Sequence, residues 1–157
     1  MVGGVNDIDE ERAAHEAFVT LTHAAESLNA CVHRHLAGMG ITVSQMGVLE
    51  ALYSLGPLSQ GRIGKLLLRS GGNMTLVIDN LEKRKLVRRK RKESDRRYYI
   101  VDLTVQGRKL IGELFPVHLK RITEHMGVLT RDEQAELERL CRKLGNGGLK
   151  GCQPISG

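Results

Sequence analysis

The apolar residues of this 157-residue chain recur with helical spacing except in one segment, where the spacing is that of β-strands. This change of period constrains the fold more than any other feature. Over residues 10–81 they recur mostly at intervals of three and four, as on one face of a helix. Over residues 86–91 and 97–103 the pattern becomes that of two strands joined by a short polar segment. The helical spacing then returns. The sequence therefore predicts a mainly α-helical fold with one small β-hairpin.

Side chains suited to capping mark where the predicted helices begin. Thr42 and Gln45 have the spacing of a capping box, in which each side chain satisfies a free backbone N–H. The other predicted caps are Ser59, Thr104 and the pair Thr130 and Glu133. Pro116 is expected to bend or interrupt the helix after Thr104. The residues expected on buried faces are Met46, Leu49, Leu52 and Tyr53, then Ile63, Leu66 and Leu67, and finally Met74, Val77, Ile78 and Leu81.

The predicted helix over residues 10–37 is too long for a core of this size to cover. At ~1.5 Å per residue it extends about 40 Å, with an apolar stripe along its length. Part of that stripe is therefore expected to lie against a second chain. Residues 1–9 and 145–157 are Gly-rich or lack periodicity, which predicts a mobile N-terminus and a flexible tail around a domain at 10–144.

Positive charge is concentrated in the predicted hairpin. Residues 83–97 hold ten basic and two acidic side chains, a net charge of +8, whereas the whole chain carries +6. Such a patch favours a polyanionic partner, because each neutralised phosphate releases condensed counterions. Aromatic residues make up only 3% of the chain, which disfavours a single-strand binder that works by base stacking.

Composition also excludes membrane and secreted proteins. The sequence has no run of eighteen apolar residues, and its acidic, polar start does not have the form of a signal peptide. The three widely spaced cysteines imply no disulfide framework. These features predict a cytoplasmic protein.

Two short helices, a tight Ser-Gly-Gly turn and a basic hairpin follow one another in the order of a winged helix-turn-helix. The second helix buries one apolar stripe and leaves small or polar side chains outward, a set that suits the major groove of DNA. These residues are Gly72, Asn73, Thr75, Leu76 and Asn80. The hairpin supplies charge along the neighbouring backbone, and an arginine at its tip is suited to the minor groove. The pattern predicts binding to double-stranded DNA.

The segment from Leu58 to Gly107 resembles the MarR family (multiple antibiotic resistance regulators). Its LSQ opening, the run VIDNLEKRKLVRR and the Asp-Arg-Arg wing tip before a strand and Leu-Thr carry this resemblance. Flanking helices extend it to about residues 10–144. The resemblance implies a homodimeric transcription regulator, usually a repressor, on a pseudo-palindromic operator. It implies dimerisation helices at 10–37 and 104–144 around a winged helix-turn-helix lobe at 42–103.

The resemblance also nominates individual residues. Asn73 and Thr75 are candidate base readers, and Asp95 is expected to fix a wing arginine through a charge-assisted pair. Lys85 stands where the family commonly has glycine, at a left-handed position after the recognition helix. The residues expected to contact DNA are Ser70, Gly72, Asn73, Thr75, Leu76, Asn80, Lys90, Arg91, Asp95, Arg96 and Arg97, with Arg96 or Arg97 in the minor groove.

A small-molecule effector is expected between the dimerisation helices and the DNA-binding lobe. Position alone nominates Phe18, His35, Met46 and Tyr53 as lining residues. No metal and no cofactor are expected. Cys31 and His35, four apart on a helix, share a face and could chelate together, with His118 and His125 completing a site. A packed thiol with surface histidines is the preferred interpretation, and oxidation sensing at Cys31 is disfavoured because this residue lies on an apolar stripe.

The sequence contains no phosphate-binding loop, nucleophile elbow or paired catalytic carboxylates, so an enzyme is not expected. The alternative to a sequence-specific regulator is an architectural nucleic-acid-binding protein that tolerates many sequences and uses only the basic wing.

Overall fold

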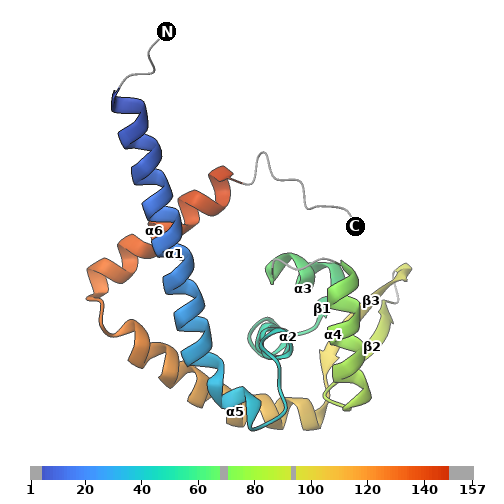
Figure 1. Ribbon diagram of the computed structural model, residues 1–157. Helices are drawn as coiled ribbons and strands as arrows, with labels where there is room; N and C mark the ends of the chain where they lie inside the picture. Colours follow the sequence, from blue (N-terminus) through green and yellow to red (C-terminus); the bar gives the residue numbers. More distant parts are fainter. Residues whose placement is uncertain (1–4, 68–70, 93–94, 149–157) are drawn as a thin grey trace. The chain divides into compact units, whose positions relative to one another are not determined.

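The computed structural model describes residues 5–67, 71–92 and 95–148, with the side chains of residues 5–7, 92, 95–98 and 146–148 outside that description. The chain divides into two units, Met1–His35 and Leu36–Gly157. The helices are α1 (Val5–Ala37), α2 (Val43–Leu55), α3 (Gln60–Leu66), α4 (Gly71–Lys83), α5 (Val105–Met126) and α6 (Arg131–Gly148). The strands are β1 (Leu58–Ser59), β2 (Val87–Lys92) and β3 (Asp95–Leu103), as Figure 1 shows. The predicted fold class, mainly α with a small β wing, is confirmed.

The predicted caps begin the helices. At α2 the Thr42 hydroxyl accepts from the Gln45 N–H at 3.2 Å, and the Gln45 side chain accepts from the Thr42 N–H at 3.0 Å. Thr130 and Glu133 form the same reciprocal pair before α6. The hydroxyls of Ser59 and Thr104 accept from backbone N–H groups three residues later. Each cap satisfies donors that the first turn of a helix leaves free.

Several helix boundaries differ from the prediction. The first helix begins at Val5 rather than near Glu10, and α6 continues to Gly148. Of the two effects expected of Pro116, an interruption is contradicted, since α5 is one helix from Val105 to Met126, whereas a bend stays a prediction. Ile111 and Leu114, before the proline, are fully buried in this helix, and their packing offsets the hydrogen bond that proline cannot make. Among the described residues, no helix is both long and apolar enough to cross a membrane.

The second unit has a hydrophobic core that α2, α3, α4, α5 and the sheet share. All four predicted stripe residues of α4 are buried, as are Met46, Leu49, Leu52 and Ile63. Tyr53 was predicted to point inward, but it is 38% exposed and its ring lies 5.8 Å from that of Phe115. The prediction was wrong because the buried face of α2 runs through Val48, Leu49 and Leu52, which leaves Tyr53 at its edge.

Leu66 is a second correction, since it was also expected on a buried face and is exposed. Leu67, the C-cap residue of α3, lies against α2 instead. A Cβ added at Gly47 of α2 would lie 3.0 Å from a Leu67 methyl carbon, so the absence of a side chain at Gly47 makes room for Leu67.

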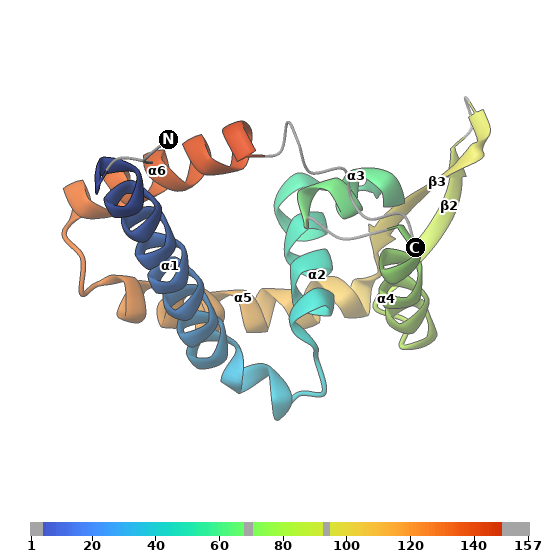
Figure 2. The ribbon, with the colours of Figure 1, turned by 45° about the horizontal axis from the view of Figure 1, so that its top comes forward.

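The wing is part of a three-stranded antiparallel sheet rather than the predicted two-stranded hairpin. The strand order is β1-β3-β2, with Leu58 opposite Val101 and Val87 opposite Leu103. Strand β1 has two residues, too few for a sequence period to be visible. The pairing of β1 with β3 joins the start of α3 to the base of the wing. Figure 2 shows α4 beside the β2–β3 hairpin.

The turn from α4 into β2 fixes how the wing leaves the recognition helix. The Lys85 N–H donates to the Glu82 carbonyl at 2.8 Å, and the Leu86 N–H donates to the Leu81 carbonyl at 3.0 Å. These two bonds form a Schellman motif, with Lys85 in the left-handed position at φ 58°. The left-handed conformation expected for residue 85 is therefore confirmed.

The start of α5 closes over the same turn. The Thr104 hydroxyl donates to the Lys85 carbonyl at 2.6 Å, and the Thr104 N–H donates to the Leu86 carbonyl at 3.1 Å. A Cβ added at Gly107 would lie only 1.8 Å from the Leu86 carbonyl oxygen, so only glycine permits this approach.

Candidate nucleic-acid interface

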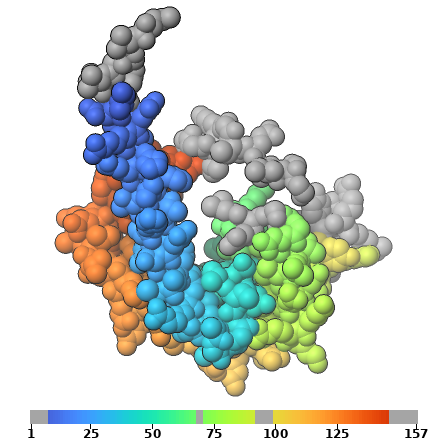
Figure 3. All heavy atoms as spheres, viewed as in Figure 1, coloured from blue at the N-terminus to red at the C-terminus, as the bar shows by residue number. Residues whose placement is uncertain are grey.

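The outward face of α4 carries the residues predicted to read DNA. Burial of Met74, Val77, Ile78 and Leu81 on one side leaves the opposite side exposed among the described residues. The exposed residues on this helix include Gly72, Asn73, Thr75, Leu76 and Asn80. Figure 3 shows part of the α4 surface in light green. A helix with a free face of small and amide side chains is suited to the major groove.

Thr75 is held within the protein by its own hydroxyl group. The hydroxyl donates to the Gly71 carbonyl at 3.0 Å and accepts from the Gln60 side-chain nitrogen at 2.7 Å. Because a hydroxyl has one proton, Thr75 in this conformation has no donor left for a base. Gln60, from the first turn of α3, is a residue of this surface that the sequence analysis did not nominate. Its only signal was its place in the LSQ opening.

Arg89 connects the wing to the recognition helix. It lies on β2, but its guanidinium group contacts Asp79 at 2.6 Å and Glu82 at 2.7 Å, both on α4. Its backbone N–H also donates to Glu82 at 2.9 Å, and a longer bond of 3.4 Å reaches Gln60. The side chain is only 18% exposed. One of the ten basic residues in the charged segment is therefore part of the fold and has two acidic neighbours.

Other cations of the wing remain at the surface. Lys90 is exposed. Arg91 is also exposed, with its Nε atom 3.3 Å from the Tyr99 hydroxyl and its guanidinium carbon 5.7 Å from the centre of the Tyr99 ring. Arg88 forms an ion pair of 3.0 Å with Asp102. The predicted contacts at Ser70, Asp95, Arg96 and Arg97 depend on side chains outside the described part of the chain.

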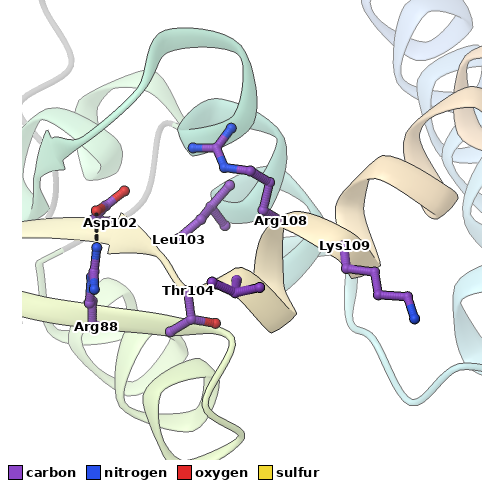
Figure 4. A pocket seen from close by; sticks show the side chains of 7 residues that line it. Arg88, Asp102, Leu103, Thr104, Arg108 and Lys109 are labelled. Atoms are coloured by element: carbon purple, nitrogen blue, oxygen red, sulfur yellow. Dashed lines mark hydrogen bonds and ion pairs between the residues drawn. The ribbon is translucent and has the colours of Figure 1, made fainter.

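A surface depression of about 350 Å³ lies at the base of the wing, at the start of α5. Figure 4 shows the Arg88–Asp102 ion pair on one side of it, while Arg108 and Lys109 point in different directions. A second depression of about 260 Å³ lies between the α4–β2 turn and α5. Neither depression is lined by any of the residues predicted to bind an effector.

The four predicted effector residues belong to different units. Phe18 and His35 are in the first unit, and Met46 and Tyr53 are in the second. Phe18 is exposed, whereas Met46 is buried in the core. Their role in binding a ligand stays a prediction. Within the described residues, no group of three or more His, Cys, Asp or Glu side chains could hold a metal ion.

Comparison with known proteins identifies the family. The sequence profile of the MarR family matches residues 41–99. The chain is 31% identical over 128 residues to the HTH-type transcriptional regulator MhqR of Bacillus subtilis, which is 82% of this chain and 88% of that protein. Its fold matches that of reduced AbfR bound to DNA with a TM-score of 0.72, at 26% identity, over 89% of this chain and 97% of that one.

A further solved structure concerns BpsR of Bordetella bronchiseptica, in which 6-hydroxynicotinic acid regulates DNA binding. It matches with a TM-score of 0.74, at 27% identity, over 82% of this chain and 91% of that one. The helix-turn-helix geometry, the basic wing and the likeness to MhqR over most of both sequences agree. The chain therefore belongs to the MarR family of DNA-binding, helix-turn-helix transcription regulators.

Proposed function

We propose that this protein is a sequence-specific, ligand-responsive repressor that acts as a homodimer on a pseudo-palindromic operator in the cytoplasm. The observation that carries the proposal is the outward face of α4, where Asn73 and Asn80 are exposed beside a basic strand. An asparagine amide can bond both the N6 and N7 atoms of adenine, which gives a helix in the major groove a means of reading sequence.

The wing supplies affinity that does not depend on sequence. Lys90 and Arg91 extend from β2, whose base is joined to α4 through Arg89. That connection holds the cationic strand at a set distance from the recognition helix. Contacts from Lys90 and Arg91 to phosphates would then position α4 without reading bases.

Exposed apolar residues on α1 and α6 support the homodimer. Phe18 of α1 is 68% exposed, and Leu144 of α6 is 61% exposed. Large apolar side chains of this kind on two helices outside the DNA-binding lobe are suited to burial against a second copy of the chain. A two-fold dimer would present two α4 helices to two half-sites, which explains the expected operator symmetry.

Control by a ligand is supported by the related BpsR, whose DNA binding 6-hydroxynicotinic acid regulates. A small-molecule effector of this protein would control its DNA binding in a similar way, with Phe18, His35, Met46 and Tyr53 as the candidate lining residues. Repression follows if the operator overlaps a promoter, because a bound dimer would then exclude polymerase.

The test measures affinity for two duplexes at one salt concentration. One duplex is recovered from a random-sequence pool by repeated binding and amplification, and the other has random sequence. We expect the wild type to prefer the recovered duplex ~10³-fold or more. Asn73→Ala should lose about 1–3 kcal/mol on the recovered duplex and little on the random one, since only a matched base edge is lost.

Lys90→Ala should weaken both duplexes almost equally, because phosphates are the same in each. Two variants outside this surface serve as controls: Gln106→Ala removes an exposed amide from α5, and Lys120→Ala removes an exposed cation from the same helix. Both should bind as the wild type does. If the wild type binds the two duplexes with similar affinity, the protein is instead an architectural DNA-binding protein.

A further inference from the structure

Leu76 is a large apolar side chain in the middle of a face that is otherwise small and polar. It lies four residues after Gly72 and four before Asn80, so these three share one side of α4. The side chain of Leu76 is 61% exposed. A single exposed leucine is common on protein surfaces, and its position in the centre of the reading face is what distinguishes this one.

Packing among the described residues of the lobe does not account for Leu76. The side of α4 that faces the core is filled by Met74, Val77, Ile78 and Leu81, each of them buried. Thr75 beside it makes its hydrogen bonds to Gly71 and Gln60, inside the protein. The stripe through Gly72, Leu76 and Asn80 is therefore left with an apolar centre, and its burial would require an apolar group on the partner.

We propose that Leu76 recognises the C5-methyl group of a thymine in the operator. On the major-groove edges of the four base pairs, this methyl group is the only apolar substituent. A leucine pressed against cytosine N4 or guanine O6 would instead remove water from a polar group without replacing its hydrogen bond. This inference rests on the proposed function, in which α4 enters the major groove, and it adds that the operator has thymine opposite the middle of α4.

The experiment uses the full-length protein and the duplex recovered from the random pool. The same duplex is synthesised with uracil in place of each thymine in turn, which removes one methyl group and leaves the Watson–Crick pairing unchanged. At the thymine that contacts Leu76, we expect the wild type to bind about four-fold more weakly, the effect of ~0.8 kcal/mol for one buried carbon.

Leu76→Ala should bind the thymine duplex more weakly than the wild type and should not distinguish thymine from uracil at that position. Leu76→Met keeps a flexible apolar side chain and should retain the distinction. Leu55→Ala is the matched control, since it shortens another exposed leucine, at the end of α2. It should show the same four-fold response to uracil as the wild type. The comparison of variants also removes any effect of uracil on the shape of the duplex.

Two results would overturn the proposal. One is a wild type that prefers its recovered duplex over random DNA but is insensitive to every uracil replacement. The other is a Leu76→Ala variant with the same response to uracil as the wild type. Loss of the preference for the recovered duplex itself would instead contradict the proposed function, so the two failures are distinguishable.

Discussion

Replacing Arg89 with alanine should destabilise the DNA-binding lobe, although Arg89 lies in the most basic segment of the chain. Its guanidinium group makes one contact of 2.6 Å with Asp79 and one of 2.7 Å with Glu82. A hydrogen bond to a charged group contributes about 1.5–3 kcal/mol. The Asp79 and Glu82 side chains are 42% and 40% exposed, so solvation of the carboxylates by water reduces the net contribution of each bond to stability. We therefore expect a loss of ~2 kcal/mol for the pair of bonds.

Lys90→Ala is the matched control, because Lys90 is the next residue on the same strand and is exposed. Urea unfolding should give Lys90→Ala a stability within ~0.5 kcal/mol of the wild type. In DNA binding the order of the two variants should be the opposite, with Lys90→Ala affected more than Arg89→Ala. Lys90→Ala should lower the slope of log K against log salt by ~0.9, the value for one phosphate contact. Arg89→Ala, under conditions where it is folded, should leave that slope unchanged because its charge already has two acidic partners.

An Arg89→Ala variant that is as stable as the wild type, and that lowers the salt slope as Lys90→Ala is expected to, would contradict this structural role of Arg89. That result would mean that Arg89 exchanges its acidic partners for phosphates when DNA binds. A third variant, Asp79→Asn, helps to separate the two cases. It should lose stability if the ion pair supports the fold, and it should gain affinity for random duplex if the acid only competes with phosphate.

Other predictions concern the joints around the wing and the start of α6. Gly107→Ala should cost about 3 kcal/mol or more in urea unfolding, because the new Cβ would lie 1.8 Å from backbone, whereas Gly112→Ala in the same helix should not destabilise. Lys85→Gly should raise the free energy of unfolding by ~0.5–1 kcal/mol, and with it the urea midpoint, without changing the m-value, since φ is 58° there; a loss of stability would contradict this account of the turn. The hydrogen bonds from Thr130 hold the pKa of Glu133 below its usual 4.5, so its stabilisation is present above that pH and is lost as pH falls through the lower, folded value. Glu133→Gln should therefore flatten the acid limb of stability below about pH 4.5, and an unchanged limb would show that the cap does not titrate.

The sequence by itself determined the features that depend on interactions within a few residues. Each capping pair, such as Thr42 with Gln45, spans three residues, so its geometry follows from local sequence. The buried stripe of α4 follows from the 3.6-residue period in the same way. The resemblance also predicted the left-handed turn at Lys85, which short-range backbone bonds close.

Only the tertiary structure decided what the individual side chains in that framework do. Arg89 and Lys90 are adjacent and both basic, yet one pairs with acids of another element and the other is exposed. Thr75 is predicted to read bases, and only the structure shows that its hydroxyl bonds to Gln60, fifteen residues earlier. Such partners depend on which helix packs on which strand, and the local sequence around either residue does not predict that packing.

The same reason explains the misplaced core residues and the missed strand. Whether Tyr53 or Val48 fills the core depends on what the neighbouring helices present to α2. Strand β1 exists because β3 offers it a partner, since two residues alone do not form a strand. Local periodicity determines which segments are helices and which face of each is apolar, whereas long-range packing decides which polar groups are left free to meet DNA.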